Sequence, residues 1–328
     1  MKLLEEALKG SVRALGKLVS LIEDQAEESQ KILEKVYSRT GKARVIGVTG
    51  PPGVGKSTLL GRLAEKFLER ELSVGILAVD PSSPISGGSL LGDRIRFSSL
   101  SGADKVFIRS LSSRGALGGL SQATMNVVRL LDAIGYDVII VETIGVGQDE
   151  VEVAHIVDTM VLLLAPGFGD EIQALKAGII ELADIFVVNK VDLAGANMYV
   201  AILEKTAREA SSGKRWVPSV VKTSALHNQG MEALVTEIDK HALFLCEPET
   251  RIQLRENKLR HEILRLTDKR VKNRLEDFLG TCSQLGPLVG EVVEGRKDPY
   301  SAANQLASLF WESLREQAKE KEKEKEKK

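Results

Sequence analysis

The sequence predicts an α/β protein: a doubly wound, mostly parallel sheet with helical extensions at both ends. Two observations carry this prediction. Short apolar runs alternate with longer amphipathic ones through the middle of the chain, and most of the short runs are apolar on both faces. Strands of this kind, separated by helices, are typical of a parallel sheet that is covered on both sides. We therefore expect a ligand at the carboxyl ends of the strands.

The expected strands are short and follow one another from residue 44 to residue 225. In chain order they are RVIGVTG, SVGILAVD, DKVFIRS, DVIIVET, DTMVLLLAP, DIFVVNK and WVPSVVKTSA. The domain that contains them should span residues 43–245, after an N-terminal helical extension at 1–42 and before a C-terminal helical region at 246–318. The alternating lysines and glutamates of residues 319–328 predict a solvated, frayed tail.

Each helical extension carries its own end signals. Gly10 and Ser11 are expected to divide the N-terminal extension into two helices, with Ser11 as the cap of the second. Asp298 and Pro299 are typical of the N-cap and first position of a helix. The long charged helix of the C-terminal region predicts a homodimer contact, and the alternative is an intramolecular core. Its apolar residues are Leu259, Ile263, Leu266, Val271, Leu275 and Phe278.

Composition excludes several classes of protein. The 45 lysines and arginines nearly balance 46 aspartates and glutamates, which argues against a global field for nucleic-acid binding. The first residues are amphipathic and charged, unlike a secretory signal, and no apolar run reaches the length of a membrane span. Cys246 and Cys282 form neither a disulfide framework nor a metal pattern. We expect a cytoplasmic protein with neither a membrane nor a nucleic acid as partner.

A phosphate-binding loop follows the first expected strand. The residues from Gly50 to Ser57 fit G-x-x-x-x-G-K-[ST], between a strand and a helix. Glycines allow backbone N–H groups to point at phosphate oxygens, and the following helix adds its positive end. Lys56 would supply charge to the β- and γ-phosphates, and Ser57 a hydroxyl for Mg²⁺. The expected phosphate contacts are Gly50, Pro51, Pro52, Gly53, Val54, Gly55, Lys56, Ser57 and Thr58.

A second motif indicates the base. Asn189, Lys190 and Asp192 form N-K-x-D at the end of a strand. The Asp192 carboxylate can accept from guanine N1–H and the 2-amino group, whereas adenine would leave it unpaired. The Lys190 stem can lie over the base. The TSAL stretch after the next strand adds Ser224, Ala225 and Leu226 as expected contacts, with the Ala225 N–H directed at guanine O6.

Three acidic residues are candidates for the metal, because Mg²⁺ prefers carboxylate and hydroxyl oxygens. Asp80 follows the second strand, Glu142 ends the fourth, and Asp93 lies in the loop between the second and third. Asp80 could instead be part of an Asp-Pro turn, and Asp93 a helix cap. With Ser57 they complete the expected metal ligands. No residue is convincingly poised to supply a cation in the transition state, although Arg114 lies in a glycine-rich loop.

The chain resembles the MeaB/ArgK family of P-loop GTPases. The stretches GVTGPPGVGKSTL, AVDPSSPISGGSLLGDRIRF, IRSLSSRGALGGLS, VETIGVGQDE, LLLAPGFGDEIQALKAGIIELADIFVVNKVD and DPYSAA carry the resemblance. It implies a homodimeric GTPase that hydrolyses GTP with Mg²⁺ and acts as chaperone for an adenosylcobalamin-dependent acyl-CoA mutase, typically of methylmalonyl-CoA. Such a protein gates cofactor loading and protects the mutase, and we expect no direct cobalamin binding.

The resemblance also suggests which residues take part in catalysis. A segment containing Lys176 would couple the nucleotide to the partner. Together with Lys56 at the phosphates and the two acidic residues at the metal, the expected catalytic residues are Lys56, Asp80, Glu142 and Lys176. Two other functions stay open at this point. A metallochaperone GTPase would need a Cys/His metal store, and the histidines here are scattered. An arginine/ornithine transport-linked kinase or ATPase fits the N-K-x-D motif poorly, because that motif favours guanine.

Overall fold

The computed structural model describes residues 2–24, 26–80, 97, 100, 105–112, 119–143, 152–167, 177–211 and 215–326. The chain divides into two compact units, Met1–Leu254 and Arg255–Lys328, and each unit is described by itself.

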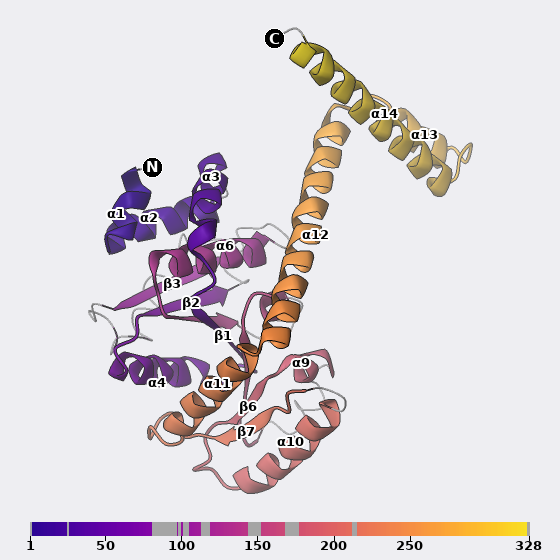
Figure 1. Cartoon of the computed structure of the whole chain (residues 1–328). Coiled ribbons are helices and arrows are strands. Elements are labelled where there is room, and N and C mark those ends of the chain that lie inside the picture. The colour runs from indigo at the N-terminus through magenta and orange to yellow at the C-terminus, as the bar shows by residue number, and fades with distance from the viewer. Residues whose placement is uncertain are drawn as a thin grey trace. The chain divides into compact units, whose positions relative to one another are not determined.

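One parallel sheet organises the first unit (Figure 1). The described strands lie in the order β3-β2-β4-β1-β5-β6-β7, and every neighbouring pair is parallel. This arrangement confirms the predicted fold class and all of the predicted strands. Their bounds are β1 Arg44–Thr49, β2 Val74–Asp80, β3 Val106–Ser112, β4 Val138–Thr143, β5 Thr159–Leu164, β6 Ile185–Val188 and β7 Ser219–Lys222.

The centre of the sheet is the point where the chain changes direction. Strand β1 lies between β4 and β5, with Val48 paired to Glu142 on one side and to Val161 on the other. From β1 the chain first builds outward to β2 and β3, and later crosses to add β5, β6 and β7 on the opposite side. Open parallel sheets bind ligands at the carboxyl ends of the strands beside such a switch point.

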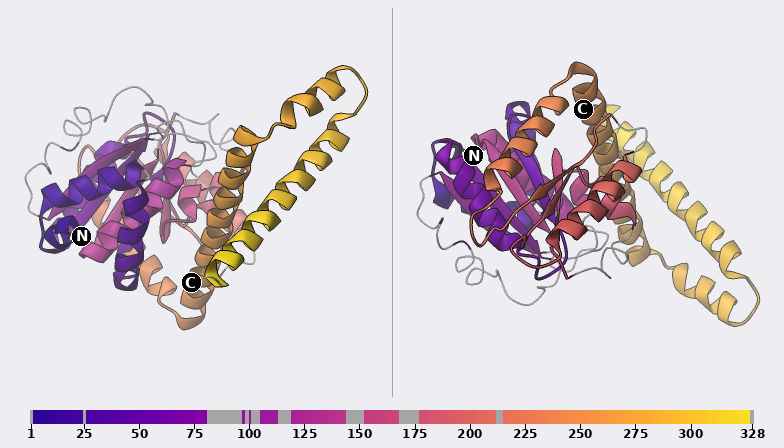
Figure 2. Two further views of the ribbon diagram at one scale, coloured as in Figure 1. Left: turned by 90° about the horizontal axis from the view of Figure 1, so that it is seen from above. Right: turned by 90° about the horizontal axis from the view of Figure 1, so that it is seen from below.

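Helices cover both faces of the sheet (Figure 2). Helices α4 (Lys56–Glu69) and α11 (Met231–Leu245) pack on one face, where Leu59, Leu63 and Leu234 are completely buried. Helices α6 (Gly119–Ile134) and α10 (Ala196–Ala210) pack on the other face, and the short α9 (Ala177–Leu182) precedes β6. The double covering explains why the strands are apolar on both faces.

The N-terminal helices are part of the same core. Helices α1 (Lys2–Leu8), α2 (Val12–Glu23) and α3 (Glu27–Val36), with the 3₁₀ turn Tyr37–Arg39, join a buried cluster that includes β2, β3 and α6. Ser11 caps α2 as predicted, because its Oγ accepts from the Ala14 N–H at 3.3 Å. Glu23 on α2 pairs with Arg109 on β3. The Asp132 carboxylate on α6 accepts from the N–H groups of residues 41, 42 and 43.

The second unit is helical. It contains most of α12 (Pro248–Thr281), α13 (Leu285–Val293) and α14 (Pro299–Glu326). Phe278 on α12 contacts Phe310 on α14 with ring centroids 5.5 Å apart, so part of the predicted apolar face is an intramolecular core. Asp298 caps α14 as predicted, accepting from the N–H groups of Tyr300 and Ser301.

Helix α14 also continues further than the sequence suggested. It runs to Glu326, so most of the segment expected to be a frayed tail is helical. Lysine and glutamate both have high helix propensity, and residues three apart in this alternating stretch carry opposite charges. None of the described helices has both the length and the apolar character that crossing a membrane requires.

Candidate nucleotide-binding site

The loop between β1 and α4 has a backbone that only glycine adopts without strain. Gly50, Gly53 and Gly55 have φ angles of 151°, 81° and 98°. A Cβ on Gly50 would lie 2.1 Å from the Leu163 carbonyl oxygen, and one on Gly55 would lie 2.6 Å from Asn189 Nδ2. The loop therefore packs closely against β5 on one side and against the segment that follows β6 on the other. This close packing fixes the loop at the carboxyl end of β1, where the sequence placed the phosphate site.

Lys56 begins α4 and is only 8% exposed. Its Nζ donates to the carbonyl oxygens of Gly50 at 2.7 Å and Pro51 at 3.0 Å. The ammonium group is thus held against the loop, beside the N-terminal end of α4. A helix N-terminus and a lysine together make a favourable place for phosphate oxygens.

Ser57 and Glu142 meet beneath the loop. Ser57 Oγ donates to Glu142 Oε1 at 3.3 Å, and Glu142 is only 2% exposed on β4. The last residues of β1 and β4, Thr49 and Thr143, have buried hydroxyls with no hydrogen-bond partner in the described part of the chain. Carboxylate and hydroxyl oxygens are the donors that Mg²⁺ prefers, so Ser57 and Glu142 fit the expected metal.

The other candidate ligands are only partly described. Asp80 ends β2 at the same edge of the sheet, two residues beyond Ala78, which pairs with Glu142. The Asp80 side chain and the whole of Asp93 lie outside the described residues, as do Lys176 and Arg114. The roles expected for these four residues remain predictions. Among the described residues, no group of three or more His, Cys, Asp or Glu side chains could hold a metal.

Asn189 joins three segments of the site. Its Nδ2 donates to the Val54 carbonyl at 2.9 Å, and its Oδ1 accepts from the Ala225 N–H at 2.9 Å and from Thr223 Oγ1 at 3.2 Å. Asn189 is 3% exposed and Thr223 is completely buried. The sequence predicted Asn189 as a nucleotide contact. In the structure its side chain holds the loop after β1 and the stretch after β7 together through hydrogen bonds. The contribution of Thr223 was missed, although it is the first residue of the TSAL stretch.

Asp192 is held by the same stretch. Ser224 Oγ donates to Asp192 Oδ1 at 2.5 Å. This hydrogen bond is the main reason that the pKa of Asp192 lies below its ordinary value, and a backbone N–H adds to it. The carboxylate is therefore ionised at neutral pH and suited to accept from two N–H donors of a base. Its orientation is set by Ser224 rather than by burial.

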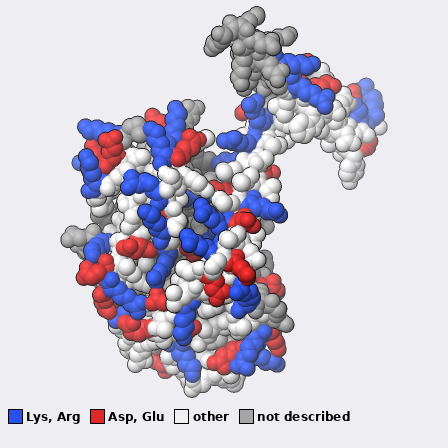
Figure 3. All heavy atoms as spheres, viewed as in Figure 1, with Lys and Arg blue, Asp and Glu red and all other residues white. Residues whose placement is uncertain are grey.

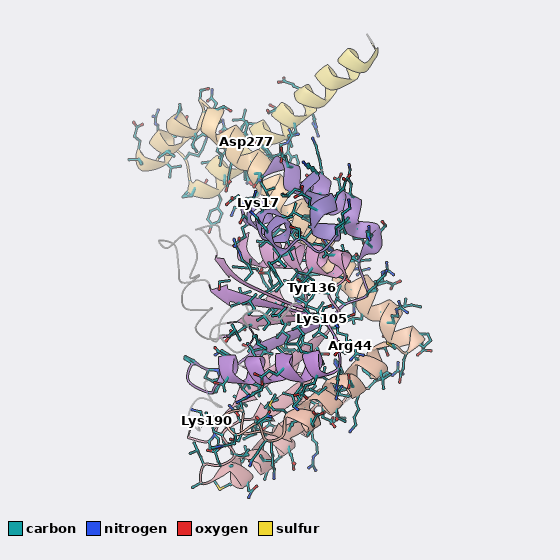
Figure 4. The ribbon with its side chains drawn as sticks, turned by 90° about the vertical axis from the view of Figure 1, so that its left-hand side faces the viewer. Lys17, Arg44, Lys105, Tyr136, Lys190 and Asp277 are labelled. Atoms are coloured by element: carbon teal, nitrogen blue, oxygen red, sulfur yellow. The ribbon has the colours of Figure 1, made fainter. Side chains whose placement is uncertain are left out.

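The remaining base contacts lie around Asp192. Lys190 has a φ of 57°, and its Nζ donates to the Gly53 carbonyl at 2.7 Å, which places its stem beside the loop. Figure 4 shows Lys190 at the edge where the strands end, whereas Arg44, Lys105 and Tyr136 lie at the opposite edge, where strands begin. Leu226 is 73% exposed. The Ala225 N–H, expected to meet guanine O6, donates to Asn189 in the described geometry.

Taken as chemistry, these residues could hold phosphate oxygens, a metal ion and a base along one edge of the sheet. Asn189 and Lys190 reach from the base segment to the carbonyls of Val54 and Gly53 in the phosphate loop. These hydrogen bonds keep the phosphate loop and the segment with Asn189 and Lys190 at a fixed separation. The arrangement fits one ligand that has a triphosphate at one end and a purine at the other.

Comparison with known proteins supports the same interpretation. A family model described as "Methylmalonyl Co-A mutase-associated GTPase MeaB" matches residues 15–278. GTPase ArgK of Escherichia coli is 36% identical over 284 residues, covering 82% of this chain and 85% of the relative. The mouse "Methylmalonic aciduria type A homolog, mitochondrial" is 38% identical over 245 residues, covering 68% of this chain and 58% of the relative.

A solved structure is also similar. The crystal structure of an LAO/AO transport system kinase matches with a TM-score of 0.71 and 28% identity, covering 94% of this chain and 97% of that one. The family model spans most of the chain, including the phosphate loop and the N-K-x-D motif. The chain belongs to the MeaB family of P-loop GTPases.

Proposed function

We propose that this GTPase is a chaperone for an adenosylcobalamin-dependent acyl-CoA mutase of the methylmalonyl-CoA type. The observation that carries the proposal is the family match over residues 15–278, because the family is described by its association with that mutase. In this proposal the nucleotide state decides whether cofactor enters the mutase, and the complex protects the mutase from inactivation. The GTPase binds the partner and does not itself hold the cobalamin.

The site supports the hydrolytic half of the proposal. Lys56 and the N-terminal end of α4 place positive charge where the phosphate oxygens bind, and charge on those oxygens is what the reaction must stabilise. Ser57 and Glu142 would hold Mg²⁺, which when bound neutralises charge on the β- and γ-phosphates. Asp192 selects guanine through its two acceptor oxygens, with Ser224 holding the carboxylate in place.

Binding of the mutase could change the rate of GTP hydrolysis through a cation that the free protein does not bring to the phosphates. Lys56 and Lys190 both donate to carbonyls of the phosphate loop, so each ammonium group has a fixed position in the site. A further cation brought to the phosphates raises hydrolysis about 10³-fold or more in related phosphoryl transfers. We propose that mutase binding supplies this change through the segment that contains Lys176.

A homodimer is the assembly we propose for the free protein. In the second unit, Val289, Val293 and Trp311 are 54%, 81% and 55% exposed. Large apolar side chains that are exposed on the helices of one small unit are typical of an interface, and a second copy would cover them. Phe278 contributes less than its place in the sequence suggested, because it already packs on Phe310.

The transport-linked kinase is the alternative, and its support is the similarity to the crystal structure of an LAO/AO transport system kinase. Asp192 and Ser224 argue for guanine as the base, and a kinase would also need a phosphate acceptor. A metallochaperone role has less support, because a Cys/His store is absent from the described residues.

One experiment tests the proposal. The purified chain is mixed with a cobalamin-dependent mutase from the same organism, with GDP or with a non-hydrolysable GTP analogue. Size-exclusion chromatography with light scattering then measures the mass of each species. We expect a dimer alone, and a complex whose amount differs between the two nucleotides. A complex that forms equally with both, or no complex, would contradict gating by nucleotide.

A further inference from the structure

A stretch of α12 in the second unit combines exposed apolar side chains with an excess of positive charge. From residue 255 to residue 274, eight basic residues stand against three acidic ones. The basic residues are Arg255, Lys258, Arg260, Arg265, Lys269, Arg270, Lys272 and Arg274, and the acidic ones are Glu256, Glu262 and Asp268. Glu262 is buried, so it contributes little to the exposed surface. Figure 3 shows basic side chains along this helix.

Spacing places three of the apolar residues on one face. Leu259, Ile263 and Leu266 are four and three residues apart, which is one stripe of an α-helix. Ile263 is 62% exposed, Leu266 is 38% exposed and Leu259 is half-buried. Arg255 and Arg270 lie at the two ends of this stripe, and Arg260 lies at its border. We call these six residues the α12 stripe. At about 1.5 Å per residue, it extends over about 22 Å of helix.

The three arginines are available for a partner. Arg255, Arg260 and Arg270 are exposed, and none forms an ion pair within the part of the chain that the structure describes. Arginine is enriched at protein interfaces, and its planar group pairs well with carboxylates. An apolar centre with arginines around it therefore fits a protein surface that offers carboxylates around an apolar patch.

Charge argues against a second copy of this chain as the occupant. Two copies that met through the α12 stripe would bring arginines toward arginines, with Glu256 as the carboxylate on the same face. Like charges placed opposite one another destabilise an interface. The charged residues near Val289 and Val293 in the sequence are of both signs and pair with one another, Arg296 with Glu294 and Lys297 with Glu291. The exposed Val289, Val293 and Trp311 therefore suit the homodimer better. The apolar centre also distinguishes the stripe from a surface for nucleic acid, which would be dominated by phosphate contacts.

We propose that the α12 stripe is a docking surface for an acidic face of the partner mutase. This inference rests on the proposed function and adds to it the partner's chemistry and the residues that meet it. None of the six residues of the stripe is among the candidate phosphate, metal or base contacts, so changes in them should alter the complex and leave basal GTP hydrolysis unchanged.

The test uses the full-length protein and the mutase. The variant Arg255→Glu/Arg260→Glu/Arg270→Glu is compared with a control of equal charge change, Lys9→Glu/Arg13→Glu/Lys17→Glu. The control side chains are exposed, Lys9 in the turn after α1 and Arg13 and Lys17 on α2. We expect the first variant to weaken the complex about tenfold or more and to reduce its dependence on salt, and the control to bind as the wild type does. Ile263→Ser should weaken binding without changing the salt dependence.

Circular dichroism and basal GTP hydrolysis verify that each variant is folded. Undiminished binding by the triple-arginine variant, or equal weakening by the control, would overturn the docking surface alone. Loss of the homodimer in the triple-arginine variant would assign the stripe to a second copy and would also overturn the inference. If the wild type forms no complex with the mutase, the proposed function fails and the inference fails with it.

Discussion

Asn189 Nδ2 lies 2.9 Å from the carbonyl oxygen of Val54 and donates a hydrogen bond to it. The two residues are 135 positions apart in the chain, one in the proposed base-binding segment and the other in the loop between β1 and α4. The same side chain accepts from Ala225, so one buried amide joins three loops. In the proposed site, the protein would therefore set the distance between phosphate and base before any nucleotide binds, which would lower the cost of ordering the site.

Replacement of Asn189 by alanine should weaken the fold and nucleotide binding together. The Val54 carbonyl and the Ala225 N–H would each lose a partner, and an unpaired buried polar group costs about 1–3 kcal/mol. We expect a lower free energy of unfolding in urea and a weaker affinity for GDP in a fluorescence titration. Asn197→Ala is the matched control, because Asn197 is exposed and pairs only at the surface. Equal effects from both variants would contradict the bracing role.

Asp192→Asn should reduce selectivity for guanine. In the proposed site the wild-type carboxylate would accept from two base N–H groups, and an amide would meet those donors poorly. Loss of hydrogen bonds to a charged group costs about 1.5–3 kcal/mol, or about tenfold to a hundredfold in GTP affinity. Xanthosine triphosphate should bind the variant better than it binds the wild type, since it offers an oxygen in place of the 2-amino group. Equal affinity of the wild type for ATP and GTP would end this assignment.

Glu142→Gln should weaken Mg²⁺ binding more than it weakens nucleotide binding. The substitution keeps the size of the side chain that meets Ser57 and removes its charge, so we expect the Mg²⁺ concentration for half-maximal hydrolysis to rise about tenfold or more. Glu71→Gln is the control, since Glu71 is exposed and pairs with Lys105. The assignment would be wrong if the Mg²⁺ dependence were the same in both variants.

We expect His241 to make the free energy of unfolding depend on pH. Burial lowers the pKa of His241 to about 4, partly opposed by Asp158, and its Nδ1 lies 2.8 Å from Thr159 Oγ1. The unfolded chain binds this proton near pH 6.5, so the folded state loses stability as the pH falls from about 6.5 to about 4. The full loss from this group is about 3 kcal/mol.

Urea unfolding of the wild type and of His241→Gln at pH 5.0 and pH 7.5 measures this contribution. The variant lacks the titrating group, so its free energy of unfolding should change less between the two pH values. The same change in both proteins would show that other groups determine the pH dependence.

Much of this molecule could be predicted from its sequence. The apolar runs predicted each described strand because a sheet covered on both faces leaves a local signal in every strand. Gly50, Lys56, Asn189 and Asp192 were found through motifs with fixed spacing. The contacts between motifs could not be predicted, because the bonds from Asn189 to Val54 and from Lys190 to Gly53 depend on the packing of loops far apart in the chain. Phe278 was expected to face a second copy, and only the structure reveals Phe310 beside it.

The central claim is that the mutase controls this GTPase. The most direct measurement is the rate of GTP hydrolysis at saturating GTP, with and without a cobalamin-dependent mutase from the same organism. We expect slow hydrolysis by the free protein and a rate about tenfold higher or more with the mutase, because a partner that orders the site or brings a cation to the phosphates lowers the barrier. An unchanged rate at mutase concentrations that saturate the complex would contradict the claim.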